Sequence, residues 1–462
     1  MITPAFIRDL SWEKFLDLFR YDAANPLLFS SGFFLFLFIG FLVVYLALKE
    51  RTLTRVIYVT LFSLYFYYKS SGVWFLLLVF VATSDFLIAR RVARASSHRA
   101  GKWWVTLSLC VNLGMLAYFK YFNFLLGLLA RLGHELGNLF GNATLQGLGH
   151  EHADIFLPVG ISFFTFQSLS YIIDVHRGRV QPLRRWIDYL FYVSFFPPLV
   201  AGPIIRAREF LPQMHRRPFV SRSDFGEGFF LILCGVFKKV VISDYISLNF
   251  VDRVFDAPLL YTGVENLLGV YGYALQIYCD FSGYSDMAIG IALLLGFRFN
   301  LNFDSPYQSA SITEFWRRWH ISLSSWLKDY LYISLGGNRK GRAHMYLNLF
   351  ITMLLGGLWH GASAHFILWG AWHGAGLAVH KFIAGRLRAN KPAAAQTSLP
   401  RRIAGILLTF HFVCFGWIFF RAPSMQTAWE MLTRIFTDFR PEIFPQFITG
   451  YASVCFLMLL GF

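Results

Sequence analysis

Long apolar blocks constrain this chain more than any other feature of its sequence. The first block, LLFSSGFFLFLFIGFLVVYLA, covers residues 27–47, and later blocks include VWFLLLVFVATSDFLIA and IFLPVGISFFTFQSLSYII. A helix of about 20 apolar residues crosses a bilayer, where every backbone polar group must find a partner within the structure. Charged residues make up 15 % of the chain, whereas about a quarter is usual in soluble domains. The pattern predicts an all-α polytopic membrane protein.

The blocks divide the sequence into about 11 predicted transmembrane helices. They lie at residues 27–48, 55–69, 72–90, 103–130, 155–174, 225–247, 263–296, 344–361, 363–381, 403–421 and 447–462. Before them, Trp12, Phe15, Leu16 and Phe19 share one helical face, which predicts an interfacial amphipathic helix. The predicted organisation is therefore an N-terminal segment, 1–26, and a membrane domain, 27–462. Its last block is still apolar where the chain ends, as in a truncated span.

The net charge of +16 is concentrated in short connections between apolar blocks. The connections at 90–102, 175–187 and 381–402 are rich in arginine and lysine and have almost no acids, whereas 131–154 carries more acids than bases. Basic connections stay in the cytoplasm, so these three are predicted to be cytoplasmic and the N-terminus to lie outside. Because the cations flank membrane segments, contact with a lipid bilayer explains them better than nucleic-acid binding.

Two segments depart from simple spans. DYLFYVSFFPPLVAGP, residues 188–203, contains adjacent prolines that interrupt a helix, and both of its flanks are basic. HISLSSWLKDYLYISLGGNRKGR, residues 320–342, is also apolar with basic flanks. Irregular backbone at membrane depth must be covered by protein or line a hydrated cavity. We therefore predict two re-entrant or interfacial segments near the cytoplasmic side.

His360 is the leading candidate for chemistry. It lies within residues 343–380, which contain no Asp, Glu, Lys or Arg, and glycines flank it at 356, 357 and 361. A polar side chain inside a membrane domain faces protein or a hydrated path and is functional by default. A neutral imidazole accepts protons near neutral pH, as general-base catalysis requires. A structural histidine that forms a hydrogen bond between helices remains the alternative.

The neighbouring histidines, His365, His373 and His380, are interpreted as structural. Spacings of five and eight residues between His360, His365 and His373 do not bring them to one helical face, and no acid lies nearby. No metal site is therefore predicted.

Two further stretches gather polar groups. In SITEFWRRWHISLSSWLKDY, residues 311–330, an apolar stripe from Phe315 to Leu327 is flanked by His320, Arg317 and Arg318. The arginines would contact lipid phosphates or the phosphates of a nucleotide-bearing donor. In QIYCDFSGYSDMAIG, two carboxylates must be paired, hydrogen-bonded or hydrated, either to support a polar tunnel or to serve proton-coupled transport.

Five segments together resemble the membrane-bound O-acyltransferase family, and within it the bacterial alginate O-acetyltransferase branch. They are PVGISFFTFQSLSYIIDVHRG, FFPPLVAGPIIR, YCDFSGYSDMAIGIALLLGF, NFDSPYQSASITEFWRRWHISLSSWLKDYLYISLGGNR and GGLWHGASAHFILWGAWHG. The resemblance implies transmembrane and re-entrant helices around a central tunnel that an acyl donor enters from the cytoplasm. It implies that His360, in its LWHG context, is the catalyst. His320, in FWRRWHISLS, would support the tunnel or the donor end.

The resemblance further implies a multi-pass protein of the bacterial inner membrane. It would transfer an acyl group, most simply acetyl, for O-acetylation of an envelope polysaccharide such as alginate. The donor would be acetyl-CoA, with no permanently bound cofactor, and periplasmic partner proteins would complete the transfer. Arg317 and Arg318 of residues 311–330 are the candidates to bind this donor.

Two alternatives remain open. D-alanyl transfer to teichoic acid from a carrier-protein thioester is the alternative within the family. A transporter or flippase is the alternative from another class, although the inverted repeat typical of many transporters is not evident.

Overall fold

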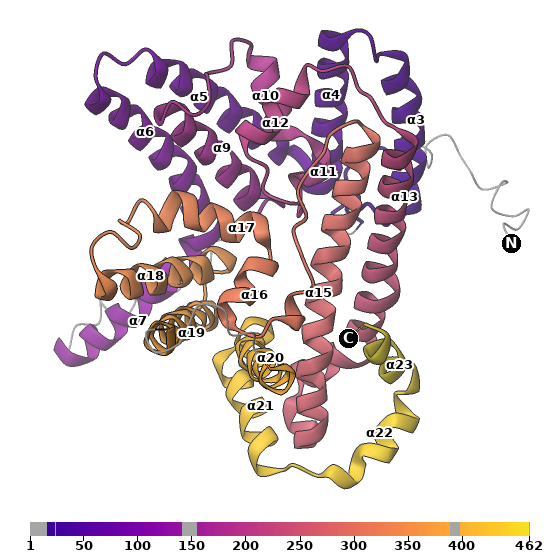
Figure 1. The fold of residues 1–462 in the computed structure, drawn as a ribbon, viewed down its shortest axis with the longest axis vertical. Coiled ribbons are helices and arrows are strands. Elements are labelled where there is room, and N and C mark those ends of the chain that lie inside the picture. The colour runs from indigo at the N-terminus through magenta and orange to yellow at the C-terminus, as the bar shows by residue number, and fades with distance from the viewer. Residues whose placement is uncertain (1–15, 24, 141–154, 389–397, 462) are drawn as a thin grey trace, which may run out of the picture. The chain divides into compact units, whose positions relative to one another are not determined.

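The computed structural model describes residues 16–23, 25–140, 155–388 and 398–461. These residues form helices with short connections, and no strand occurs among them, which confirms the all-α class for the described part of the chain (Figure 1). Trp12 and Phe15 of the predicted amphipathic helix lie outside the described residues. Two compact units make up the chain. The first comprises Met1–Phe119, Phe156–Val220 and Leu295–Phe297, and the second comprises Lys120–Ile155, Ser221–Leu294 and Arg298–Phe462.

The first unit is a group of helices around a core rich in aromatic residues. Its helices are α3 (Gly32–Ala47), α4 (Thr52–Ser71), η1 (Gly72–Trp74), α5 (Phe75–Ala93), α6 (His98–Leu116), α9 (Ile161–His176), α10 (Trp186–Ser194), α11 (Phe196–Leu199) and α12 (Ala207–Met214). Between α5 and α6, the fully buried Asp85 accepts hydrogen bonds from Ser108 at 2.7 Å and Asn112 at 2.8 Å. A buried carboxylate requires such partners, so this contact fixes how the two helices face each other.

The predicted interruption at the adjacent prolines is present. α10 ends before Phe195, and the short α11 carries Pro197 and Pro198 in its first turn. The ring of Phe196 lies 5.1 Å from Phe62 and 5.5 Å from Phe41, measured between centroids, and its backbone N–H donates to Ser63 at 3.2 Å. Aromatic side chains of α3 and α4 therefore cover the break, as irregular backbone in an apolar environment requires.

The second unit contains the longest helix of the described chain. Its helices are α7 (Phe122–Phe140), α13 (Arg222–Val236), η3 (Phe237–Asp244), η4 (Ser247–Val251), α14 (Asp252–Asp256), η5 (Pro258–Leu260), α15 (Gly263–Leu294), η6 (Pro306–Gln308), α16 (Ile312–Arg318), α17 (Ile321–Trp326), η7 (Leu327–Tyr332), α18 (Arg342–His360), α19 (Ala364–Arg388), α20 (Leu399–Arg421), α21 (Met425–Thr437), η8 (Pro441–Ile443), α22 (Phe444–Gly450) and α23 (Ala452–Gly461), and η2 (Ala117–Tyr121) leads into α7. α13 and α15 run side by side (Figure 1). A Cβ atom at Gly235 would lie 2.5 Å from the carbonyl oxygen of Gly283. Glycine thus permits the close approach of these two helices.

Two consecutive lysines of η3 pair with the carboxylates of α15. Lys238 lies 2.6 Å from Asp286, and Lys239 lies 2.6 Å from Asp280. The expectation that these carboxylates need partners is confirmed, because each forms an ion pair between η3 and α15.

Three helical stretches of the described residues are long and apolar enough to cross a membrane. They are Thr52–Ala93, His98–Glu135 and Leu399–Arg421. A fourth candidate is a pair of helices, Pro441–Gly450 and Ala452–Gly461, that meet at 97°. The span predicted at 447–462 is therefore bent at Tyr451 and not one straight helix.

Candidate active site

The stretch around His360 is the end of one helix packed closely against the next. α18 ends at His360, and the chain turns through Gly361 into α19. A Cβ atom at Gly357 would lie 2.3 Å from the carbonyl oxygen of Phe366, and one at Gly361 would lie 2.1 Å from the Phe366 ring. Of the three glycines predicted to allow close approach, Gly357 and Gly361 do so between α18 and α19, whereas Gly356 faces Leu327 of η7.

Three aromatic rings surround the imidazole of His360. Its ring centroid lies 4.8 Å from Trp359, 5.2 Å from Trp369 and 5.1 Å from Phe420, and all three contacts are edge-to-face. The side chain remains partly accessible, and it makes no hydrogen bond to any described residue. Its polar atoms are therefore available to a substrate, while apolar walls restrict bulk water.

Two consecutive side chains hold the backbone just before His360. The Lys120 ammonium donates a hydrogen bond to the carbonyl oxygen of Trp359 and lies 5.4 Å from the centroid of that ring. The Tyr121 hydroxyl donates to the carbonyl oxygen of Leu358 at 2.6 Å. The last carbonyls of a helix lack partners within the helix, and a cation is favourable there. Lys120 thus fixes the end of α18 and places a positive charge near His360.

His320 is buried in a different kind of environment. It is 1 % exposed and adopts a left-handed backbone conformation, with φ 42° and ψ 58°, which is uncommon for a residue other than glycine. Its Nδ1 lies 3.3 Å from Oδ1 of Asn302, whose amide donates to Ser285 at 3.0 Å. Its Nε2 has no hydrogen-bond partner among the described residues. The Trp359 ring lies 6.5 Å from His320, so this one indole contacts both candidate histidines.

The other three histidines form hydrogen bonds typical of structural residues. His373 is 0 % exposed and accepts a hydrogen bond from Nε1 of Trp316 at 3.3 Å. Nδ1 of His365 lies 3.0 Å from the Phe419 carbonyl oxygen, and Nδ1 of His380 lies 2.9 Å from the Thr313 hydroxyl. Among the residues that the structure describes, no group of three His, Cys, Asp or Glu side chains is arranged to hold a metal ion.

The apolar stripe from Phe315 to Leu327 is interrupted at Trp319 and His320. α16 ends at Arg318, α17 begins at Ile321, and the left-handed residue His320 stands between them. The amide N–H of Ile321 donates to the Asn302 carbonyl oxygen at 2.8 Å, so a loop stabilises the break. The apolar stripe is therefore divided between two short helices, α16 and α17.

The two arginines of α16 have different surroundings. Arg318 contacts Asp304 at 3.4 Å and Glu314 at 3.1 Å, and these carboxylates neutralise it. Arg317 is exposed, and among the described residues no carboxylate lies within ion-pair distance of it. The same holds for Lys328 of η7 and Lys381 of α19, which makes these three cations candidates for anion binding.

Two residues of the candidate site were not predicted from the sequence. They are Lys120, which contacts the backbone before His360, and Lys381, which is a candidate for anion binding together with Arg317 and Lys328. A signal for Lys120 was present, because a lone lysine inside the predicted span 103–130 is expensive and requires a partner. What the sequence lacked was the partner, since Lys120 and Trp359 are far apart along the chain and meet only through folding.

Residues 161–422 match the MBOAT, membrane-bound O-acyltransferase, family. The chain belongs to this family and is a membrane-bound O-acyltransferase.

Its relatives extend over most of the chain. It is 42 % identical to the probable alginate O-acetylase AlgI of Pseudomonas aeruginosa over 89 % of this chain and 75 % of that protein. It is 34 % identical to the peptidoglycan O-acetyltransferase of Helicobacter pylori over 88 % of this chain and 79 % of that protein. The teichoic acid D-alanyltransferase of Bacillus subtilis is 29 % identical over 57 % of this chain and 68 % of that protein.

Proposed function

We propose that this protein transfers an acetyl group from a cytoplasmic donor across the inner membrane for O-acetylation of an envelope polysaccharide such as alginate. The observation that carries the proposal is the imidazole of His360, partly accessible and without a hydrogen bond to a described residue, inside a box of three aromatic rings. The similarity to alginate O-acetylases over most of the chain supports the acceptor class.

His360 is the general base of the proposed reaction. The hydroxyl that first receives the acetyl group attacks the thioester carbonyl of the donor, and the imidazole takes the hydroxyl proton as the new C–O bond forms. The C–S bond then breaks, and the thiolate leaves and takes up the proton held by the imidazolium. The aromatic walls exclude water, which would otherwise hydrolyse the thioester.

His320 and Arg317 have supporting roles in the proposal. Nε2 of His320 is buried without a partner among the described residues, so it is suited to hold a polar group of the donor by a hydrogen bond. Arg317, with Lys328 and Lys381, would bind the phosphates of acetyl-CoA. Arg318 contributes less, because Asp304 and Glu314 already neutralise it. No cofactor is bound permanently.

The proposal includes a topology and an acceptor route. We place about 11 transmembrane helices and the re-entrant segments around a central tunnel, with the N-terminus outside. The donor enters from the cytoplasm, and periplasmic partner proteins pass the acetyl group to the polysaccharide.

Acetylation in cells tests the proposal. The protein is produced in a strain that exports alginate and lacks its own alginate O-acetylation, and ester-bound acetate is measured on alginate and on peptidoglycan. Acetate on alginate that depends on His360 is the expected result. Acetate on peptidoglycan alone would replace the acceptor with the one named for the Helicobacter pylori relative. No transfer to either polymer would refute acetylation of both.

D-alanyl transfer is the second candidate, supported by the more distant relative from Bacillus subtilis. Inverted membrane vesicles supplied with acetyl-CoA or with a D-alanyl carrier-protein thioester separate the two donors. Consumption of the D-alanyl thioester without consumption of acetyl-CoA would favour this candidate.

A further inference from the structure

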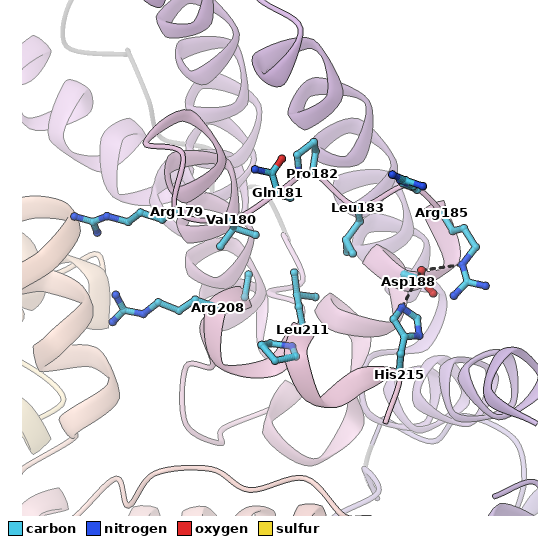
Figure 2. A pocket seen from close by; sticks show the side chains of 13 residues that line it. Arg179, Val180, Gln181, Pro182, Leu183, Arg185, Asp188, Arg208, Leu211 and His215 are labelled. Carbon is cyan, nitrogen blue, oxygen red and sulfur yellow. Dashed lines mark hydrogen bonds and ion pairs between the residues drawn. The ribbon is translucent and has the colours of Figure 1, made fainter. Parts of the chain in front are cut away.

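Two adjoining cavities in the first unit are lined by arginines. One has a volume of about 580 Å³ and lies between the loop after α9 and α12 (Figure 2). The other, of about 530 Å³, lies between the end of α5 and the same loop. Both are lined by Gln181, Pro182, Leu183 and Arg184. We call the two together the arginine cleft.

The cleft has far more positive than negative charge. Its arginines are Arg90, Arg94, Arg179, Arg184, Arg185 and Arg208, and its one carboxylate is Asp188. Asp188 is already engaged, because it lies 2.9 Å from Arg185 and 3.4 Å from His215 (Figure 2). The lining therefore contains a large excess of cations that its own carboxylate does not neutralise.

Among the residues that the structure describes, no carboxylate lies within ion-pair distance of Arg90, Arg94 or Arg184. Arg179 lies 3.7 Å from Asp174, which is longer than a charge-assisted hydrogen bond. Figure 2 shows Arg179 and Arg208 extending in the same direction from the loop and from α12. A guanidinium group that no carboxylate neutralises is suited to planar, bidentate recognition of phosphate oxygens.

We propose that the arginine cleft binds a phosphate ester, with Arg184 contacting it from the wall that the two cavities share. The apolar lining residues Val180, Leu183 and Leu211 provide room for the uncharged part of such a ligand beside its phosphate. The same chemistry would serve the headgroup of an anionic phospholipid or a soluble phosphate compound. This inference stands apart from the proposed acetyl transfer, since it concerns binding in the first unit and not the chemistry at His360.

A binding experiment with two probes tests the inference. The purified protein is titrated with inorganic pyrophosphate in detergent. Its thermal stability is measured separately in nanodiscs of phosphatidylcholine with and without phosphatidylglycerol. The test variant is Arg94→Gln with Arg184→Gln. The matched control is Arg99→Gln, an exposed arginine of the same basic connection that lines neither cavity.

The double variant should either weaken pyrophosphate binding or remove the stabilisation by phosphatidylglycerol. The loss of pyrophosphate affinity should be about tenfold or more, because each charge-assisted contact is worth that order of affinity. A loss for pyrophosphate alone assigns the cleft to soluble phosphates, and a loss for phosphatidylglycerol alone assigns it to a lipid headgroup. Unchanged responses to both probes would overturn the inference. An equal loss in Arg99→Gln would also overturn it, because general surface charge would then explain the binding. Both readouts are independent of activity, so failed acetyl transfer leaves this test intact.

Discussion

Alanine substitutions at His360 and His373 should impair different properties of the protein, although the two residues lie in adjacent helices and in the same apolar stretch. His360 makes no hydrogen bond to a described residue and is partly accessible. His373 is fully buried and accepts the indole hydrogen bond of Trp316. Removal of the first imidazole should therefore impair turnover, whereas removal of the second should impair stability.

The magnitudes follow from these contacts. A general base contributes about 10²–10⁴-fold, so His360→Ala should cost about 3–5 kcal/mol of transition-state stabilisation. The stability of this variant should change little, because only aromatic edge contacts are lost. His373→Ala leaves the Trp316 N–H buried and without its acceptor, which costs about 1–3 kcal/mol of folding stability.

The assay combines acetate transfer in inverted vesicles with the thermal stability and membrane abundance of each variant. Rates are divided by the amount of folded protein, so that loss of protein is not counted as loss of catalysis. Normal specific activity of His360→Ala would refute its role as the base and leave His320 as the candidate. A large loss of specific activity in a stable His373→Ala protein would refute the separation of the two roles.

Three further predictions concern other residues. Lys120→Ala should lower kcat about tenfold or more with little change in KM, because the backbone before His360 loses the hydrogen bond from Lys120, and Lys120→Arg should restore most of the rate. An unchanged kcat in Lys120→Ala would contradict a role for this hydrogen bond in positioning His360. Arg317→Gln should raise the KM for acetyl-CoA about tenfold. Arg318→Gln should change the KM much less, because Asp304 and Glu314 already neutralise that arginine, and equal effects on KM would argue against this difference. Ser97 and Ser398 lie in connections predicted to be cytoplasmic. Cysteines introduced there, with the accessible native cysteines replaced, should react with an impermeant maleimide only after the membrane is opened. Labelling from the outside would refute the proposed topology.

Much of the candidate site could be predicted from local sequence. The polarity of His360 within an apolar stretch and the glycines beside it identified the segment, and the structure gives Gly357 and Gly361 the close contacts expected of them. Asp280 and Asp286 were expected to be paired, hydrogen-bonded or hydrated, and the structure shows that they pair with Lys239 and Lys238. The break at His320 could not be predicted, because the spacing of the apolar residues around it is that of a continuous helix. The contacts that stabilise the break come from Asn302, which lies in a distant loop.

The sequence by itself determined the class of this protein. Inside a membrane, the backbone N–H and C=O groups of long apolar blocks find hydrogen-bond partners when the blocks form helices. The basic connections restrict how those helices are oriented. Only the tertiary structure decided which polar side chains meet. Lys120 contacts the end of α18, Asn302 contacts His320, and Asp304 contacts Arg318. These pairings join different elements, and a pattern with a period of a few residues carries no information about contacts of that kind.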